Sequence, residues 1–140
     1  RFQRQFAPPI LAGTKRHTIR NPRTGRSGHA RPGDPLQLYT GMRTKQCRLI
    51  GTAVCQWVRG VVMNFPRPSV IVRTLDGLQP IATYADDTAL NEFARSDGFD
   101  DWAALAAFWR ETHRSTQAFE GVIIGWDDTF RAVTIQGGTL

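Results

Sequence analysis

The chain has 140 residues and a formal net charge of +6, which fits one domain with a modest core. None of its apolar runs is long enough to cross a bilayer, so the composition argues against a helical membrane protein. Its first residues lack the apolar region of a secretory signal. We therefore expect one intracellular, cytoplasmic domain over residues 1–140, with no membrane partner.

The charge is divided unevenly along the chain. Residues 1–59 hold twelve lysines and arginines against Asp34 alone, a charge of +11, whereas residues 60–140 hold six against eleven acids, a charge of −5. Sixteen of the eighteen cations are arginine, whose guanidinium pairs with phosphate through two parallel hydrogen bonds and stacks on bases. This pattern predicts a nucleic-acid or nucleotide partner. The alternative is that the basic half docks on the acidic half, within the fold or in an oligomer.

The first predicted element is a short helix over residues 8–12. Pro8 and Pro9 fit its first turn, and Gly13 ends it because glycine adopts a positive φ at little cost. The residues that follow are predicted to form a strand.

Residues 13–20, Gly-Thr-Lys-Arg-His-Thr-Ile-Arg, bring an amine, a hydroxyl and a guanidinium together behind that glycine turn. On a strand Arg16, Thr18 and Arg20 share one face, so Lys15 joins Thr18 only if it lies in the turn or on a bulge. Such a set suits an anionic or amide-bearing ligand. The alternative is a surface hairpin with solvated charges.

Residues 21–33 have no apolar periodicity and many turn formers, which predicts a loop. The loop carries Arg23, Arg26 and Arg31, and loops this basic often bind polyanions. Alternating apolar residues then predict strands over residues 36–39 and 47–58, with further β structure at 61–62 and 69–72.

The cysteines and histidines do not indicate a disulfide or a metal site. Cys47 and Cys55 fall in one predicted strand, where eight residues at about 3.3 Å each hold the sulfur atoms beyond bonding reach. We expect two free thiols. His17, His29 and His113 are isolated in sequence, so we expect no metal and no cofactor.

In the second half of the chain the spacing of apolar residues changes from the alternation of strands to the spacing of helices. Two short helices are predicted, one after Asp86 that includes Leu90 and Phe93, and one after Asp101 that includes Leu105 and Trp109. Strands are predicted over residues 119–126 and 130–135. This order fits an α+β domain built on a small, closed or partly closed β-barrel with short helices at its side. For Trp102, Phe108 and Trp109, core packing is favoured over base stacking.

Asp97 lies at the end of the first of those helices, before Gly98 as the expected C-terminal cap. The helix dipole is negative there, which disfavours a carboxylate by a few tenths to about 1 kcal/mol. A nearby cation such as Lys15 would compensate it, and these two groups with the Thr18 hydroxyl can serve nucleophilic or acid–base chemistry. The alternative is that Asp97 faces water or caps the next helix beside Asp100.

Taken in order, four motifs resemble the ASCH domain of the PUA-like superfamily over nearly the whole chain. These are residues 13–20 with the pattern G-x-K-x-x-T-x-R, Pro32-Gly33-Asp34, residues 94–99 with Phe108-Trp109, and residues 119–126. The resemblance implies a PUA-type barrel with a cleft beside the helices that recognises RNA or a modified nucleoside. The segment over residues 59–83 is longer than its counterpart in compact members of the family.

The resemblance also implies a possible reaction. Some compact bacterial members are amidohydrolases that remove the acetyl group from N4-acetylcytidine with a lysine, a threonine and a glutamate. The lysine and threonine fall on Lys15 and Thr18, and the acid falls on Asp97, which is one methylene shorter.

Three functions follow from these patterns. The first is an RNA or modified-nucleoside binding domain with a pocket of Lys15, Thr18 and Asp97 and with arginines on phosphates, namely Arg16, Arg20, Arg23, Arg26 and Arg31. The second is an amidohydrolase of an acylated nucleoside, and the third is a protein-interaction module. The sequence leaves the oligomeric state open.

Overall fold

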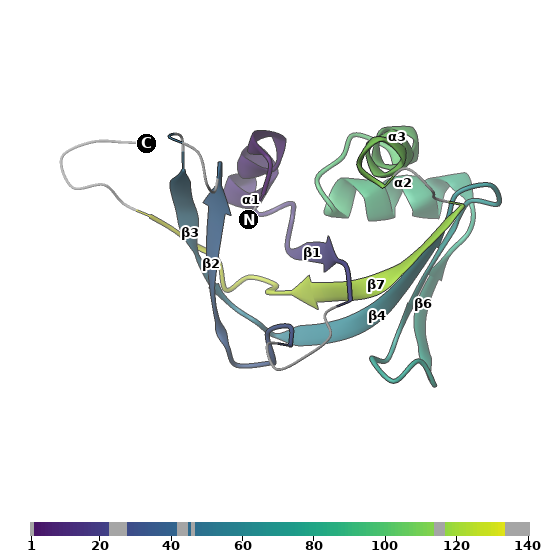
Figure 1. The fold of residues 1–140 in the computed structure, drawn as a ribbon, viewed down its shortest axis with the longest axis horizontal. Helices are drawn as coiled ribbons and strands as arrows, with labels where there is room; N and C mark the ends of the chain where they lie inside the picture. The colour runs from purple at the N-terminus through teal and green to yellow at the C-terminus, as the bar shows by residue number, and fades with distance from the viewer. Residues whose placement is uncertain (1, 23–27, 42–44, 46, 114–116, 134–140) are drawn as a thin grey trace.

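The structure is a computed structural model that describes residues 2–22, 28–41, 45, 47–113 and 117–133. Within these residues, antiparallel strands form two sheets that are accompanied by short helices (Figure 1). The α+β class predicted from the sequence is therefore confirmed. The two sheets are hydrogen-bonded separately, and the described residues do not form a closed barrel.

The larger sheet has five strands. Their spatial order is β1 (His17–Arg20), β7 (Ala118–Gly125), β4 (Trp57–Asn64), β5 (Ser69–Arg73) and β6 (Pro80–Tyr84). The long apolar strand β7 pairs with β1 on one side and with β4 on the other. Strand β1, which contains the second half of the motif at residues 13–20, is thus paired with the strand predicted over residues 119–126.

The smaller sheet has the order β2 (Pro35–Thr40), β3 (Arg48–Val54) and β8 (Arg131–Ala132). Strand β8 covers only two residues of the strand predicted over 130–135: Phe130 and Val133 lie outside it, and residues 134 and 135 lie outside the described part of the chain. Strand β2 matches the prediction for residues 36–39.

The prediction of a single strand over residues 47–58 is wrong. The chain leaves β3 at Val54 and enters β4 at Trp57, in the other sheet. At the crossing, the Cys55 N–H donates to the Asp34 carbonyl, whereas the Gln56 N–H donates to Gly125. The strand breaks here because the backbone changes its hydrogen-bond partners. No glycine or proline marks the break, and the alternation of side chains continues through it, so the sequence did not reveal it. Cys47 and Cys55 flank β3, and no disulfide joins them.

The N-terminal helices are a 3-10 turn, η1 (Arg4–Phe6), and α1 (Ala7–Ala12). The predicted helix signals are confirmed, because prolines occupy the first turn of α1 and Gly13 follows it with φ of 79°.

The two later helices are α2 (Asp87–Ser96) and α3 (Trp102–Thr112). Each begins with an aspartate cap: Asp86 accepts from the Ala89 N–H and Asp101 from the Ala104 N–H, both at 2.8 Å. Among the described residues, no helix is long and apolar enough to span a membrane.

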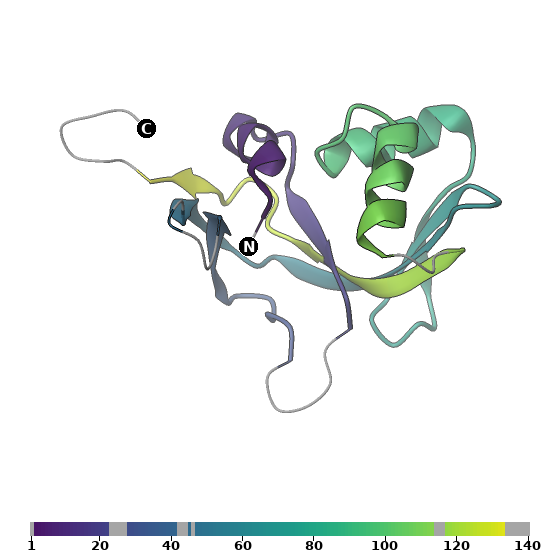
Figure 2. The same cartoon turned by 45° about the horizontal axis from the view of Figure 1, so that its top comes forward.

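Two apolar clusters make up the core. The larger one lies between helices α2 and α3 and one face of the five-stranded sheet, and it includes Phe93 and Trp109 (Figures 1 and 2). The smaller one joins η1 and α1 to the three-stranded sheet and includes Phe6. Phe99 and Phe108 pack against both clusters, and their rings lie 5.4 and 5.6 Å from that of Phe6. Trp102 stacks on Phe65 against the larger cluster, so its predicted core role is confirmed.

Candidate functional site

Lys15 is positioned by the turn that ends α1. Gly13 has the left-handed conformation, and the backbone N–H of Lys15 donates to the Pro9 carbonyl at 3.1 Å. Strand β1 begins only at His17. Lys15 therefore lies in the turn, which is one of the two placements that the sequence allowed.

Asp97 is positioned by the end of α2. It is the C-terminal cap residue, and Gly98 follows it with φ of 95°. The Phe99 N–H returns to the Ala94 carbonyl at 2.9 Å, which closes the helix as a glycine cap does. The added Cβ of an alanine at 98 would lie 3.1 Å from Lys15 Cδ, so the two turns pack directly against each other.

Lys15 and Asp97 form a buried ion pair. Lys15 Nζ lies 2.8 Å from Asp97 Oδ1 and also donates to the Asp97 carbonyl oxygen at 2.7 Å. The side chains are only 3% and 6% exposed. One ammonium thus neutralises both the carboxylate and the negative end of α2. The expected compensation of Asp97 by Lys15 is present. The alternatives, that Asp97 faces water or caps the start of the next helix, are wrong, because Asp97 is buried and Asp101 caps α3.

The pair alters both pKa values. Burial lowers the pKa of the Lys15 amine, the Asp97 charge opposes this without cancelling it, and Arg20 adds to the lowering. Burial acts to raise the pKa of Asp97, but Lys15 and His17 together outweigh it, so this pKa lies below its ordinary value. Asp97 is therefore an ionised carboxylate at neutral pH.

His17 is a third member of this cluster. Its Nε2 lies 3.2 Å from Asp97 Oδ1, but the two atoms are not aligned as a hydrogen bond. The ring stacks on Phe93 with a centroid distance of 5.8 Å. This placement was not predicted from the sequence. His17 follows Lys15 by two positions and begins β1, so its nearness to the partner of Lys15 was the available signal.

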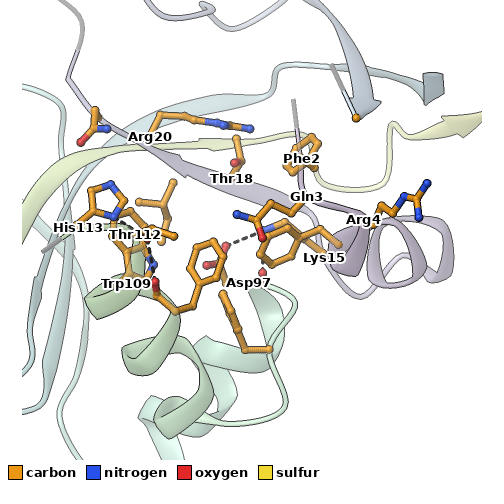
Figure 3. Close-up of a pocket in the computed structure, with 16 residues that line it drawn as sticks. Phe2, Gln3, Arg4, Lys15, Thr18, Arg20, Asp97, Trp109, Thr112 and His113 are labelled. Carbon is orange, nitrogen blue, oxygen red and sulfur yellow. Dashed lines mark hydrogen bonds and ion pairs between the residues drawn. The ribbon is translucent and has the colours of Figure 1, made fainter. Parts of the chain in front are cut away.

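The ion pair forms part of the wall of a cavity of about 760 Å³, which we call the first cavity. Thr18 and Arg20 also line it (Figure 3), although no hydrogen bond joins the Thr18 hydroxyl to Lys15 or Asp97 within the described residues. The remaining wall is rich in aromatic rings. These come from Phe2, Phe6, Phe99, Phe108, Trp109 and His113.

Both later helices direct their C-terminal ends to the first cavity. Asp97 ends α2, and Trp109, Thr112 and His113 come from the last turn of α3 and the residue after it. Because helix C-termini carry partial negative charge, the cations Lys15 and Arg20 offset a negative potential there.

Two of the other predicted arginines lie outside this cavity. Arg16 is exposed, and its Nε donates to the Gly13 carbonyl at 2.7 Å. Arg31 is exposed in the segment before β2, where its N–H donates to Asp34. Neither lines the first cavity. Arg23 and Arg26 lie outside the described residues.

The cavity also holds residues that sequence reasoning missed. Phe2 lies beside it, with the Arg20 guanidinium over its ring at 5.0 Å and Lys15 Nζ at 5.9 Å. Arg4 also lines it, on the side away from His113 and Trp109 (Figure 3). Neither residue belongs to a sequence motif. The Phe2 N–H donates to the Tyr39 carbonyl, a tertiary contact that residue spacing does not predict. Among the described residues, no group of three or more potential metal ligands occurs.

Comparison with known proteins adds no assignment: a scan against protein-family models and searches of curated proteins and solved structures found no match.

The buried pair makes a prediction for stability. We expect Lys15→Met and Asp97→Leu each to lower the free energy of unfolding by about 3–5 kcal/mol, because each leaves one uncompensated buried charge. The double variant leaves neither charge unpaired, so its loss should be smaller than the sum of the two single losses by at least about 1–3 kcal/mol. Urea unfolding followed by tryptophan fluorescence measures the free energy of unfolding of the wild type, the two single variants and the double variant. Losses that add within about 0.5 kcal/mol would show that the two side chains do not interact.

The pair also predicts a pH dependence. Because the folded-state pKa of Asp97 is depressed, its contribution to stability is complete above its ordinary pKa of about 4 and is lost as the pH falls through the lower folded value. Asp97→Asn removes this contribution. The difference in unfolding free energy between the wild type and Asp97→Asn should therefore shrink from pH 6 to pH 2. A constant difference across that range would contradict the assignment.

Proposed function

We propose that the chain binds a nucleoside, free or within single-stranded RNA, in the first cavity. The observation that carries this proposal is the convergence of the Lys15–Asp97 pair, Thr18, Arg20 and several aromatic rings on one space of about 760 Å³. Pockets of this size with apolar walls and a few convergent polar groups are typical of small-molecule sites.

The chemistry of the lining suits a nucleobase. Unpaired bases are recognised by stacking on aromatic rings or guanidinium planes and by hydrogen bonds to their edges. Arg20 and Phe2 supply a guanidinium and a ring in contact. Lys15, Thr18 and Asp97 supply donors and acceptors on the same wall. The negative helix ends favour a neutral base over a phosphate at this point.

We also propose that the domain is of ASCH type. The support is that two motifs distant in sequence, residues 13–20 and 94–99, meet at Lys15 and Asp97, which are 82 positions apart. On this proposal the two sheets correspond to a partly open PUA-like barrel.

Nucleoside binding tests the function. Isothermal titration should detect cytidine or N4-acetylcytidine binding to the wild type, and Arg20→Gln should weaken it about tenfold, as expected for loss of one cation–π contact of about 1.4 kcal/mol. Arg31→Gln is the matched control, because it removes one exposed arginine that does not line the cavity. Absence of binding at millimolar nucleoside, or equal weakening by both variants, would exclude the proposal.

The second candidate function is that of an amidohydrolase, and it is favoured by the distance between Lys15 Nζ and Asp97 Oδ1. Asp97 reaches Lys15 at 2.8 Å despite being shorter than glutamate, and burial lowers the Lys15 pKa as a general base requires. In this mechanism the Thr18 hydroxyl oxygen attacks the acyl carbon and gives its proton to the Lys15 amine. The C–N bond then breaks as Lys15 passes that proton to the leaving amine, and water hydrolyses the acyl ester of Thr18, which releases the carboxylic acid and restores the Thr18 hydroxyl. The Asp97 charge opposes deprotonation of Lys15, so Lys15 acting as a fixed cation is the alternative role.

Chromatography of cytidine released from N4-acetylcytidine tests this candidate. We expect Thr18→Val to reduce turnover by at least a hundredfold if Thr18 is the nucleophile, since general base and nucleophile each contribute about 10²–10⁴-fold. Thr83→Val is the control, because Thr83 is an exposed threonine on another strand of the same sheet. No product at high enzyme concentration, or full activity of Lys15→Ala, would exclude the mechanism and leave binding intact.

A further inference from the structure

A second cavity of about 560 Å³ lies between η1–α1 and the three-stranded sheet. Its cations are Arg4 on η1, Lys45, and Arg48 at the start of β3, and all three are exposed. Its apolar surface comes from α1 and β3, including Leu11 and Ile50. None of the described residues that line it is acidic.

The second cavity adjoins the first. Arg4 lines both, and the neighbouring residues Thr40 and Gly41 at the end of β2 line the second and the first, respectively. Figure 3 shows the Arg4 guanidinium directed away from Lys15 and the centre of the first cavity. A ligand that leaves the first cavity past Gln3 and Arg4 therefore meets the second.

The two cavities differ in charge. The first contains Asp97 and the C-terminal ends of two helices, so its cations are partly neutralised by protein groups. The second contains three cations and no described carboxylate. Phosphates favour arginine and lysine that have no acidic partner, whereas sugars and base faces pack on apolar surface.

We propose that the second cavity binds the phosphodiester backbone and the adjoining nucleotide of a single strand whose base occupies the first cavity. The ligand is then a single-stranded polynucleotide and not a free nucleoside. This assignment rests on the base-binding function proposed for the first cavity. The proposed phosphate contacts are Lys45, Arg48 and Arg4. None of them belongs to the motif of residues 13–20, which supplies Lys15, Thr18 and Arg20 to the first cavity.

Binding of a cytidine octamer, measured by fluorescence anisotropy between 50 and 300 mM salt, tests the assignment. For a single strand each neutralised phosphate contributes about −0.7 to the slope of log affinity against log salt. Lys45→Gln/Arg48→Gln should weaken octamer binding and make the slope shallower by about 1.4. The same variant should bind free cytidine as the wild type does, because neither residue lines the first cavity.

The matched control is Arg67→Gln/Arg95→Gln. It removes the same charge from two exposed arginines that line neither cavity. It should change the octamer slope by much less than the Lys45/Arg48 variant does.

The outcomes separate the two proposals. If cytidine binds and depends on Arg20, but the Lys45/Arg48 variant keeps the octamer affinity and slope of its control, the second-cavity assignment is overturned and the base site stands. If Arg20→Gln leaves cytidine and octamer binding unchanged, the base site itself is overturned. Vesicles of phosphatidylglycerol serve as a third probe. If Lys45 and Arg48 are needed for vesicle binding and not for octamer binding, the second cavity is a lipid-headgroup site and the assignment is wrong.

Discussion

The contact between Lys15 and Asp97 organises this domain, because it holds together two turns that are 82 positions apart. Each turn follows a helix that ends in a left-handed glycine, Gly13 after α1 and Gly98 after α2. The ammonium satisfies a carboxylate and a helix-end carbonyl at once. Since Phe6 also contacts Phe99 and Phe108 here, the ion pair lies where the two apolar clusters meet. The spacing between the helices and β1, and hence the shape of the first cavity, depends on this contact.

Stability alone does not explain a buried ion pair. Removing two charges from water costs several kcal/mol per ion, and apolar residues of similar volume often give equal or greater stability. Lys15 and Asp97 also have shifted pKa values in a cavity wall, a combination that occurs often at functional sites. Both groups are buried and hydrogen-bonded beside glycine-capped helix ends, an arrangement that leaves little ordering cost to binding. We interpret the pair as a pre-organised polar element of the site.

The sequence predicted the features that depend on residues close together in the chain. Glycine caps, aspartate caps and apolar spacing gave α1, α2 and α3, and the helix dipole at Asp97 indicated that a cation was needed. It did not predict the change of sheet at Cys55 and Gln56, because that break depends on the hydrogen-bond partners Asp34 and Gly125 and not on residue type. It grouped Arg16 with Arg20 by alternation, but Arg16 precedes β1 and turns back to Gly13. It did not predict that Phe2 and Arg4 line cavities, because neither belongs to a motif and the pairing of Phe2 with Tyr39 is a tertiary contact.

The charge asymmetry of the chain has a local explanation on its acidic side. Asp86 and Asp101 accept hydrogen bonds at the N-termini of α2 and α3, where carboxylates are stabilised. A ten-residue helix such as α2 is about 15 Å long, so Asp86 is separated by that length from the cavity at the other end. Asp97 is the acid that lines the first cavity, and the described lining of the second has none. Asp86 and Asp101 thus cap helices, while Arg4, Lys45 and Arg48 lie beside a cavity whose described lining has no acid. The basic and acidic halves do meet within the fold, at Lys15 and Asp97, so the proposed anionic strand depends on the cations beside the second cavity that this contact leaves out.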